Sequence, residues 1–422
     1  MISWILLAIF VLIVIRAPIF VALGAPAMAY LWLRGIPIEL APQRMLGTVN
    51  ESILLAVPMF LLAGALMNRY GATARIFDFA QAVIGHVRGG LGYVTVLASM
   101  VFSAMSGSAA ADAVGVGKMT VAAMRKRGYD PNFAAAVTLS SATLAPVIPP
   151  SIIMIIYGAT ANVSIGKMFL GGVFPGLLMA ASLMAMVGWL SARRGYGRGE
   201  PFAWSRVFRT FWRAGLVMLT PVLVIGGIFS GVLTPTEASA IAVVYVIFLG
   251  IVYRKLNFGE FYRNLIQTGT AVGALMMVVA VSGLDAWVIA REQVPVMLAQ
   301  NVSEVVSSPT LVFIAILLVV LVLGLFMDAT PVILMLVPAT TPLVTAFGID
   351  PLHLGVLFCI VCVLGLITPP VGVALYGVAL VSRLPMERIF VASLPFFIML
   401  LVLVAVMVAF PSIITWLPGK WG

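Results

Sequence analysis

The chain has 422 residues, of which 63% are hydrophobic and only 9% are charged, and its formal net charge is +10. This composition excludes an ordinary soluble globular protein. Apolar runs long enough to cross a bilayer recur, as at 389–410, so the sequence predicts an all-α polytopic membrane protein. We interpret the positive charge as a mark of membrane topology and expect no binding of nucleic acid.

About ten membrane spans are expected, together with two hairpins that enter the membrane without crossing it. In chain order the continuous spans are 2–15, 19–33, 51–68, 165–190, 216–233, 235–253, 264–284 and 388–410, and prolines interrupt two more, 132–161 and 352–381. Two regions, 89–127 and 309–345, each hold two shorter apolar segments around a polar tip. Short paired segments of this kind are typical of re-entrant helical hairpins.

Basic residues indicate how these spans are oriented. The loop that starts at Arg193 carries six arginines before residue 214, and Arg125 and Arg254 begin two further basic loops. Lys and Arg accumulate in cytoplasmic loops. Threading the spans from these loops places both chain ends in the periplasm. The first hairpin then enters from the cytoplasm and the second from outside.

The second half of the chain repeats features of the first half at an offset of 220 residues. The matched positions are Ser108 and Asp328, Pro131 and Pro351, Ala145 and Gly365, Pro149 and Pro369, and Pro175 and Pro395. Because the two copies begin on opposite sides of the membrane, the sequence predicts an inverted repeat.

The repeat divides the chain into two units, residues 1–213 and 214–422. In the first unit we expect scaffold helices at 1–88, a hairpin and a broken helix at 89–162, and a helix with a cytoplasmic loop at 163–213. In the second unit the corresponding ranges are 214–308, 309–382 and 383–422. The stretches 69–90 and 284–305 look amphipathic, so we expect helices in the membrane interface there, with plain loops as the alternative.

The consecutive prolines inside two apolar spans are the most informative feature of the sequence. Proline removes a backbone donor, and an unpaired backbone group in hydrocarbon costs several kcal/mol. Broken helices therefore persist where they line a protein cavity. Their free carbonyl groups suit a hard cation, and the N-terminal ends of half-helices suit an anion. The two breaks predict an ion and substrate site, and a structural kink is the alternative.

Oxygen atoms dominate the side chains near these breaks, which favours sodium over protons. The hydroxyl groups belong to Ser103, Ser106, Ser108, Ser140, Ser141, Thr143, Ser151, Thr330 and Thr368. Oxygen ligands suit a hard cation, and no chain of buried carboxylates or histidines indicates a proton relay. The two cysteines, Cys359 and Cys362, are interpreted as small apolar residues of a buried helix rather than a redox pair.

The sequence leaves open the roles of four charged residues near these features. Asp328 is expected to order the second hairpin tip or shape the site, and Asp112 could cap the half-helix that follows it. Lys118 either snorkels toward the cytoplasm or contacts an anionic substrate. Glu237 is expected to cap the helix after "LTPTEAS", with an electrostatic role at a domain interface as the alternative.

The motifs "SGSAAAD", "APVIPPS", "LTPTEAS", "MDATP" and "GLITPPVG" together resemble the large membrane subunit of a tripartite ATP-independent periplasmic (TRAP) transporter over essentially the whole chain. The resemblance implies an elevator-type fold with a scaffold part and a transport part. It also implies sodium-driven import of an organic acid across the bacterial inner membrane. The expected partners are a periplasmic substrate-binding protein, a small four-helix membrane subunit on a separate chain, and membrane lipid.

The resemblance also implies site residues. A first sodium site would use Ser106, Ser108, Ala145, Ile148 and Pro150, and a second would use Gly324, Gly365, Thr368 and Val371. Ala145 stands where the family often has glycine, and a carbonyl ligand tolerates that change. The substrate region would lie between the tips and include Ser103, Gly107, Asp112, Ser151, Asp328, Thr330 and Pro369.

Other function classes were weighed against transport by a tripartite system. A channel, or a stand-alone sodium-coupled carboxylate carrier, would also place broken helices at mid-depth. Ser106 with Lys118 could be imagined as a serine–lysine hydrolase, but no other catalytic pair stands out, so we expect no enzyme. The chain has no GxxxxGK[ST] phosphate-binding motif and is not expected to be an ATPase.

Overall fold

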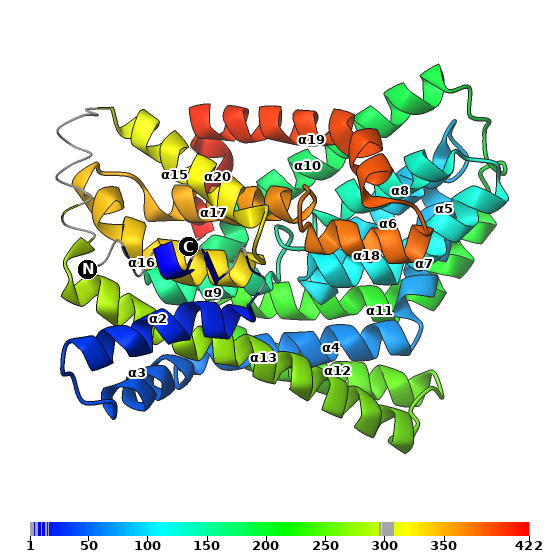
Figure 1. The fold of residues 1–422 in the computed structure, drawn as a ribbon. Helices are drawn as coiled ribbons and strands as arrows, with labels where there is room; N and C mark the ends of the chain where they lie inside the picture. The colour runs from blue at the N-terminus through cyan, green and yellow to red at the C-terminus, as the bar shows by residue number, and fades with distance from the viewer. Residues whose placement is uncertain are drawn as a thin grey trace.

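The computed structural model describes residues 17–294 and 308–421, together with residues 4, 7–9, 11–12, 15 and 297. These residues form helices and connecting turns, as Figure 1 shows. The helices of the first half are α2 (Ile19–Leu33), α3 (Leu40–Val49), η1 (Ser52–Leu55), α4 (Ala56–Arg69), α5 (Ala72–Ile84), α6 (Gly90–Ser106), α7 (Ala109–Lys126), α8 (Pro131–Ala142), α9 (Ile152–Ala161) and α10 (Ile165–Arg193).

The helices of the second half follow a comparable order. They are α11 (Trp204–Phe229), α12 (Pro235–Val252), α13 (Phe258–Arg291), α15 (Pro309–Gly324), α16 (Ala329–Ala346), α17 (Pro351–Leu366), α18 (Val373–Ser382), α19 (Met386–Ala409) and α20 (Ser412–Trp421). Within the described residues, seven helical segments have the length and apolar composition of a membrane span. They are Ser52–Arg69, Ile165–Arg193, Trp204–Phe229, Pro235–Val252, Phe258–Arg291, Ala329–Ala346 and Met386–Ala409.

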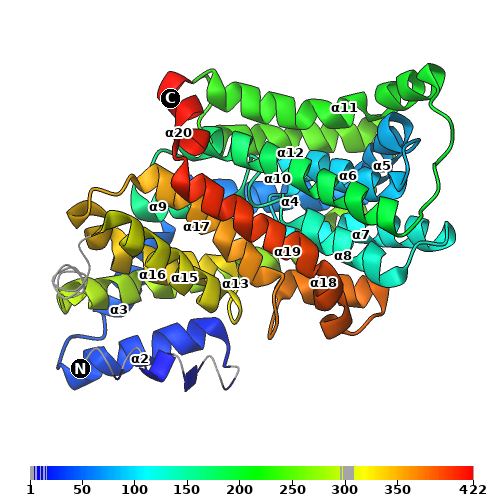
Figure 2. The same cartoon turned by 90° about the horizontal axis from the view of Figure 1, so that it is seen from above.

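The helices pack in two groups. The long α13 packs against α2, α3 and α4, α12 packs against α4, and α11 packs against α5 and α12; we call these helices the α13 group. The hairpin group consists of α6–α9 and α15–α18, in which α7 contacts α8 and α18, and α15 contacts α17. The two groups meet where α16 packs against α13 and where α6 packs against α5 and α4. Figure 2 shows α19 running along the outside of the hairpin group.

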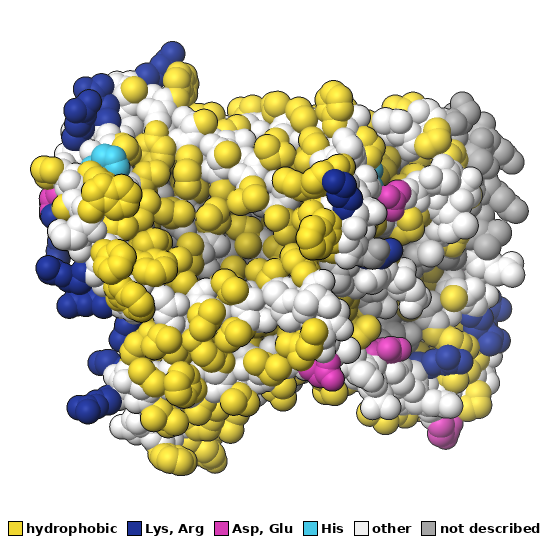
Figure 3. All heavy atoms as spheres, turned by 180° about the vertical axis from the view of Figure 1, so that it is seen from behind, with side chains coloured by type: hydrophobic (Ala, Val, Ile, Leu, Met, Phe, Trp, Pro, Cys, Tyr) yellow, Lys and Arg dark blue, Asp and Glu magenta, His cyan; other side chains and the backbone are white. Residues whose placement is uncertain are grey.

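Side chains sort by polarity along the helices. In Figure 3 hydrophobic side chains cover the middle of the face, and Lys and Arg gather toward its left edge. This basic end holds the connections from α4 to α5, from α7 to α8 and from α12 to α13, which carry Arg69, Arg127 and Lys255. An apolar belt between polar ends is the surface expected of a membrane protein.

Helix starts in the two halves follow the same local chemistry. Asp130 caps α8 and Asp350 caps α17, each accepting from a backbone N–H two residues on, and each helix has proline in its first turn. Proline suits a first turn because its missing N–H would lack a helical partner there. Helices α7 and α16 each have 18 residues and begin 220 positions apart.

Both hairpins expected from the sequence have a helix–tip–helix form. Helix α6 ends at Ser106 and is followed by Gly107, whose positive φ of 58° glycine adopts without strain, and α7 starts two residues later at Ala109. Helix α15 ends at Gly324, and α16 starts after Asp328. The broken helices also have the expected form, because residues 143–151 separate α8 from α9, and residues 367–372 separate α17 from α18.

Several predicted boundaries were wrong. Helix α11 begins at Trp204 instead of near 216, so Arg206, Arg209 and Arg213 lie on a helix rather than in a loop. Arginine stems can lie along an apolar helix surface while their charged ends reach water, which lets the span continue into this basic stretch. Helix α3 was not expected.

The two amphipathic stretches behave differently. Helix α5 occupies the first, as expected. In the second, residues 284–291 continue α13 rather than forming a separate helix, because their buried side chains pack on α2. Of the rest of that stretch, residues 295, 296 and 298–305 lie outside the described residues, as does half of the span expected at 2–15.

Candidate transport site

The tip of the first hairpin is organised by a buried carboxylate. Asp112 accepts hydrogen bonds from the Ser103 hydroxyl at 3.0 Å and the Ser106 hydroxyl at 2.5 Å. Asp112 is 1% exposed, so these two hydroxyls hold the end of α6 against the start of α7. Ser108, not Asp112, caps α7, and its hydroxyl accepts from the Ala111 N–H at 3.4 Å. The capping role considered for Asp112 was therefore wrong.

This first tip lies against the first helix break. A Cβ atom added to Gly107 would come within 2.9 Å of the Pro150 carbonyl oxygen, so the two backbones touch. The Ser151 hydroxyl donates to the Pro146 carbonyl at 2.6 Å and caps α9. Among the described residues no donor reaches the carbonyl oxygens of Ala145, Ile148 or Pro150.

The second tip and the second break are joined in a similar way. Gly324 and Gly365 pack backbone to backbone, because a Cβ atom on Gly365 would lie 2.5 Å from the Gly324 carbonyl carbon. The Val371 N–H donates to the Leu325 carbonyl at 3.3 Å. The Thr368 hydroxyl donates to the Leu364 carbonyl at 2.7 Å. This break is more open than the first, since Val371 is 45% exposed.

The residues proposed for the two sodium sites are thus brought together in two separate clusters. The hydroxyls and unbonded carbonyls of the first cluster suit a cation that prefers oxygen ligands. In the second cluster the Gly365 carbonyl already accepts from the Thr368 N–H at 3.0 Å. A carbonyl oxygen has a second lone pair, so it can still face a cation.

The two tips face each other across a small cavity of about 90 Å³. Its polar wall contains Gly107 and Ser108 from the first tip and Asp328 and Thr330 from the second. Four helices begin at this cavity, because the first residues of α7, α9, α16 and α18 line it. Helix N-termini carry a partial positive charge and unpaired N–H groups, so their convergence suits an anion.

The structure places the proposed substrate residues at different depths. Gly107, Asp328 and Thr330 line the cavity, whereas Ser103 and Asp112 lie behind the first tip and bond to each other. Ser151 and Pro369 lie in the two breaks, outside the cavity wall. Lys118 is exposed on α7 and does not line the cavity, which favours the snorkelling interpretation.

Sequence reasoning missed the far wall of this cavity. Leu61 of α4 and Leu275 of α13 close it from the α13 group. Nothing in their apolar surroundings distinguishes these two leucines from their neighbours. Asp328 caps α16 by accepting from the Ala329 N–H at 2.8 Å, which agrees with the expectation that it orders the second tip.

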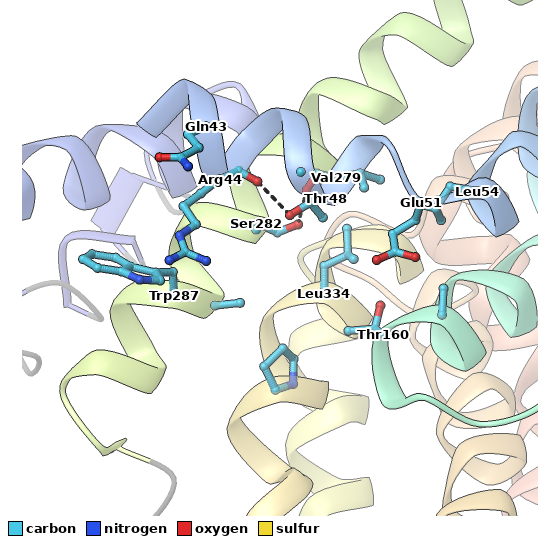
Figure 4. A pocket seen from close by; sticks show the side chains of 15 residues that line it. Gln43, Arg44, Thr48, Glu51, Leu54, Thr160, Val279, Ser282, Trp287 and Leu334 are labelled. Atoms are coloured by element: carbon cyan, nitrogen blue, oxygen red, sulfur yellow. Dashed lines mark hydrogen bonds between the residues drawn. The ribbon is translucent and has the colours of Figure 1, made fainter. Parts of the chain in front are cut away.

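A second and larger cavity, of about 760 Å³, opens between the α13 group and the hairpin group (Figure 4). Its walls come from α3, α13, α9 and α16. Arg44 and Glu51 point into it, and the Arg44 guanidinium lies 5.7 Å from the ring centre of Trp287. The sequence did not single out Arg44, so a basic side chain in this cavity was missed.

Two further expectations are settled by local geometry. Glu237 forms a capping box with Thr234, accepting from the Thr234 N–H at 2.8 Å, as expected. Cys359 and Cys362 are free and buried on α17, which confirms their interpretation as small core residues.

The fold is shared with solved membrane transporters. The Alcanivorax borkumensis YdaH transporter superposes with a TM-score of 0.66 at 13% identity, covering 89% of this chain and 88% of that one. The Neisseria gonorrhoeae antimetabolite efflux pump MtrF superposes with a TM-score of 0.62 at 12% identity, covering 88% and 83%. At this identity the likeness shows the fold alone, which is that of a multi-pass helical membrane protein.

Sequence comparison identifies the family. The profile described as "Tripartite ATP-independent periplasmic transporter, DctM component" matches residues 6–413, and the chain belongs to this family. It is 41% identical over 397 residues to the sialic acid TRAP transporter large permease of Vibrio cholerae, covering 93% of this chain and 92% of that protein.

Other relatives are named for different substrates. The chain is 38% identical to the 2,3-diketo-L-gulonate TRAP transporter large permease of Escherichia coli, covering 92% of each chain. It is also 38% identical to the C4-dicarboxylate TRAP transporter large permease of Pseudomonas aeruginosa, covering 90% of this chain and 89% of that one. These relatives are permeases, in line with the expectation that the chain is no enzyme.

Proposed function

We propose that this large permease subunit imports an organic acid together with sodium ions. One observation carries the proposal: four helix N-termini converge on a cavity that two hairpin tips close. The N-termini attract a carboxylate, and the unbonded carbonyls of the first break and the second lone pairs of the carbonyls at the second break suit a cation. Three relatives named for sialic acid, diketogulonate and C4-dicarboxylate transport support an organic acid as the substrate class.

The wide cavity at Arg44 is the proposed approach to the site. It lies beside Thr160 of α9 and Leu334 of α16, further along the helices that begin at the small cavity. Arg44 would raise the local concentration of an anion there before the substrate reaches the four N-termini. Glu51 on the same wall would limit how tightly an anion is held.

The proposed mechanism is an elevator. In it the hairpin group, with its sodium and substrate, moves along the α13 group, which stays fixed as the scaffold. Two observations support an inverted repeat of 1–213 and 214–422. Helices α7 and α16 have the same length and begin 220 residues apart, and α8 and α17 are both capped by an aspartate. We place both chain ends in the periplasm of a bacterial inner membrane, because the basic end then faces the cytoplasm.

The proposed partners are a periplasmic binding protein that delivers the acid and a small membrane subunit on a separate chain. The alternative is a stand-alone sodium-coupled carrier, or a channel, that needs no binding protein. Reconstitution in liposomes distinguishes a tripartite transporter from a stand-alone carrier or a channel. The chain and its small subunit are supplied with the loaded binding protein under a sodium gradient, no gradient, or a proton gradient alone.

Each outcome of that experiment has a clear meaning. Saturable uptake that requires both sodium and the binding protein is expected. Sodium-dependent uptake without the binding protein would favour the stand-alone carrier, and uptake that does not saturate would favour a channel. Uptake driven equally well by a proton gradient would contradict the proposal that the two clusters bind sodium.

A further inference from the structure

A cavity of about 630 Å³ lies at the basic end, away from the transport site. Its walls come from the α4–α5 turn, from α5, from α11 and from the α12–α13 connection, all within the α13 group. We call it the basic cavity. The residues that line it are Tyr70, Gly71, Ala74, Arg75, Asp78, Trp212, Arg213, Tyr253 and Lys255.

The charge of the basic cavity is positive. Arg75, Arg213 and Lys255 contribute three cations, and Asp78 contributes the one carboxylate of its wall. Among the described residues none of these four takes part in an ion pair within 4.0 Å. Three basic side chains therefore converge on a space without forming pairs with acidic groups of the described chain.

Arg75 is held in place by groups other than a carboxylate. Its Nη1 donates to the Tyr70 carbonyl at 2.9 Å and the Gly71 carbonyl at 3.1 Å. Its guanidinium carbon lies 3.7 Å from the ring centre of Tyr253. Stacking and carbonyl contacts orient a cation without neutralising it. Arg75 can therefore present positive charge to a ligand at a fixed position.

The surroundings of the basic cavity are apolar and face outward. Trp212 is 69% exposed, Phe211 45% and Tyr262 65%, on the outer surface of α11 and α13. Aromatic side chains of this kind concentrate at the level of lipid headgroups. A free anion would gain nothing from this apolar surface, whereas a lipid would place its acyl chains along it.

We propose that the basic cavity binds the phosphate headgroup of an anionic phospholipid from the leaflet at the basic end. The phosphate oxygens accept from Arg75, Arg213 and Lys255, and the acyl chains lie against α11. Basic pockets between helices on the cytoplasmic side suit such headgroups. The bound lipid joins α5, α11 and the α12–α13 connection of the scaffold.

The test measures lipid retention by the full chain, purified in detergent with its small membrane subunit. Native mass spectrometry gives the dissociation constant of the first phosphatidylglycerol added after delipidation. The variant R213Q/K255Q removes two cavity cations. The control R209Q/R263Q removes two exposed arginines of α11 and α13 that do not line the cavity, so both variants lose the same net charge.

The expected result is a dissociation constant about thirtyfold higher for R213Q/K255Q, because each basic group near a membrane surface contributes about 1 kcal/mol. The control should bind like the parent. Asp78→Asn should bind more tightly by roughly fivefold, since it removes the negative charge of the wall. The dissociation constant of phosphatidylethanolamine, which has no net charge, should differ little between the parent and the variants.

Three results would overturn the proposal. Equal retention by R213Q/K255Q and R209Q/R263Q would show that the cavity is not the site. Displacement of the lipid by an equal concentration of inorganic phosphate would indicate a site for free phosphate. Binding by the isolated chain that vanishes in the complex would mean that the small subunit covers the cavity.

Discussion

At the residue scale, the first hairpin tip separates two kinds of hydroxyl. Ser106 donates to the buried Asp112 carboxylate and is therefore oriented by it, while Ser108 caps α7 through a long contact of 3.4 Å. An acceptor held this weakly keeps most of its lone-pair capacity. Ser108 is thus the side chain at this tip that a sodium ion could recruit with the least loss.

Replacing Ser108 with alanine tests this role. We expect the sodium concentration that gives half-maximal uptake to rise roughly tenfold, which corresponds to about 1.4 kcal/mol. The matched control is Ser164→Ala, because Ser164 caps α10 through a contact of the same length, 3.4 Å. Sodium titrations of uptake that respond alike in both variants would assign Ser108 to capping alone.

At the element scale, the sequence predicted several features that local residues decide. Consecutive prolines marked the breaks after α8 and α17, and the polar tips marked where α7 and α16 begin, although the residue that caps α7 is Ser108 and not Asp112. It failed where tertiary packing decides, as for α3 and for residues 284–291, which bury apolar side chains against α2. Of the transport site, the polar tips could be predicted, but Leu61, Leu275 and Arg44 could not, since only the packing of distant helices brings them to the cavities.

Close packing of α15 on α17 provides the second prediction. Alanine at Gly365 would place a methyl group 2.5 Å from the Gly324 backbone, which cannot move aside without separating the two helices. We expect sodium to raise the thermal stability of the parent, and we expect Gly365→Ala to abolish both this rise and uptake. Gly273→Ala on α13 is the control, because nothing lies within 4 Å of its added Cβ. Retention of sodium-induced stabilisation by Gly365→Ala would count against the second sodium site.

The docking of α2 on α13 predicts a dependence of stability on pH. The Tyr30 hydroxyl donates to the Glu292 carboxylate, Arg34 approaches it at 2.8 Å, and these contacts hold the pKa of Glu292 below its ordinary 4.5. Since the pKa is lower in the folded chain, the added stability is present above pH 4.5 and is lost as pH falls through the lowered value.

Thermal unfolding of the parent and of Glu292→Gln measures this contribution. The parent should be more stable at pH 7 by at most about 1 kcal/mol, because the pair is partly exposed to water. The difference should shrink below pH 4.5. Glu39→Gln, which changes an exposed carboxylate outside every described ion pair, should show no such difference. A gap between parent and Glu292→Gln that persists unchanged in acid would exclude the carboxylate as its source.

At the scale of the whole molecule, two glycines lie where α4 of the α13 group meets the first hairpin. A Cβ atom on Gly64 of α4 would come within 3.3 Å of the Ser106 Cα, so the scaffold helix touches the tip of the first hairpin. Gly115 of α7 lies equally close to Asn68 of α4. Each glycine leaves its own side of this contact without a side chain, which suits movement of one group past the other.

A disulfide across this contact should stop that movement. A Cβ atom at Gly115 would lie 3.7 Å from Cγ of Asn68, which suits a disulfide between N68C and G115C, with Cys359 and Cys362 changed to alanine to prevent other pairing. We expect oxidation to abolish uptake and reduction to restore it. The control pair T120C/T138C joins α7 to α8 inside the hairpin group, where the two hydroxyls lie 3.1 Å apart, and should transport in both states. If oxidised N68C/G115C imports substrate at the parent rate, the hairpin group does not move along α4, and the elevator gives way to a mechanism with a fixed scaffold contact and local gating at the tips.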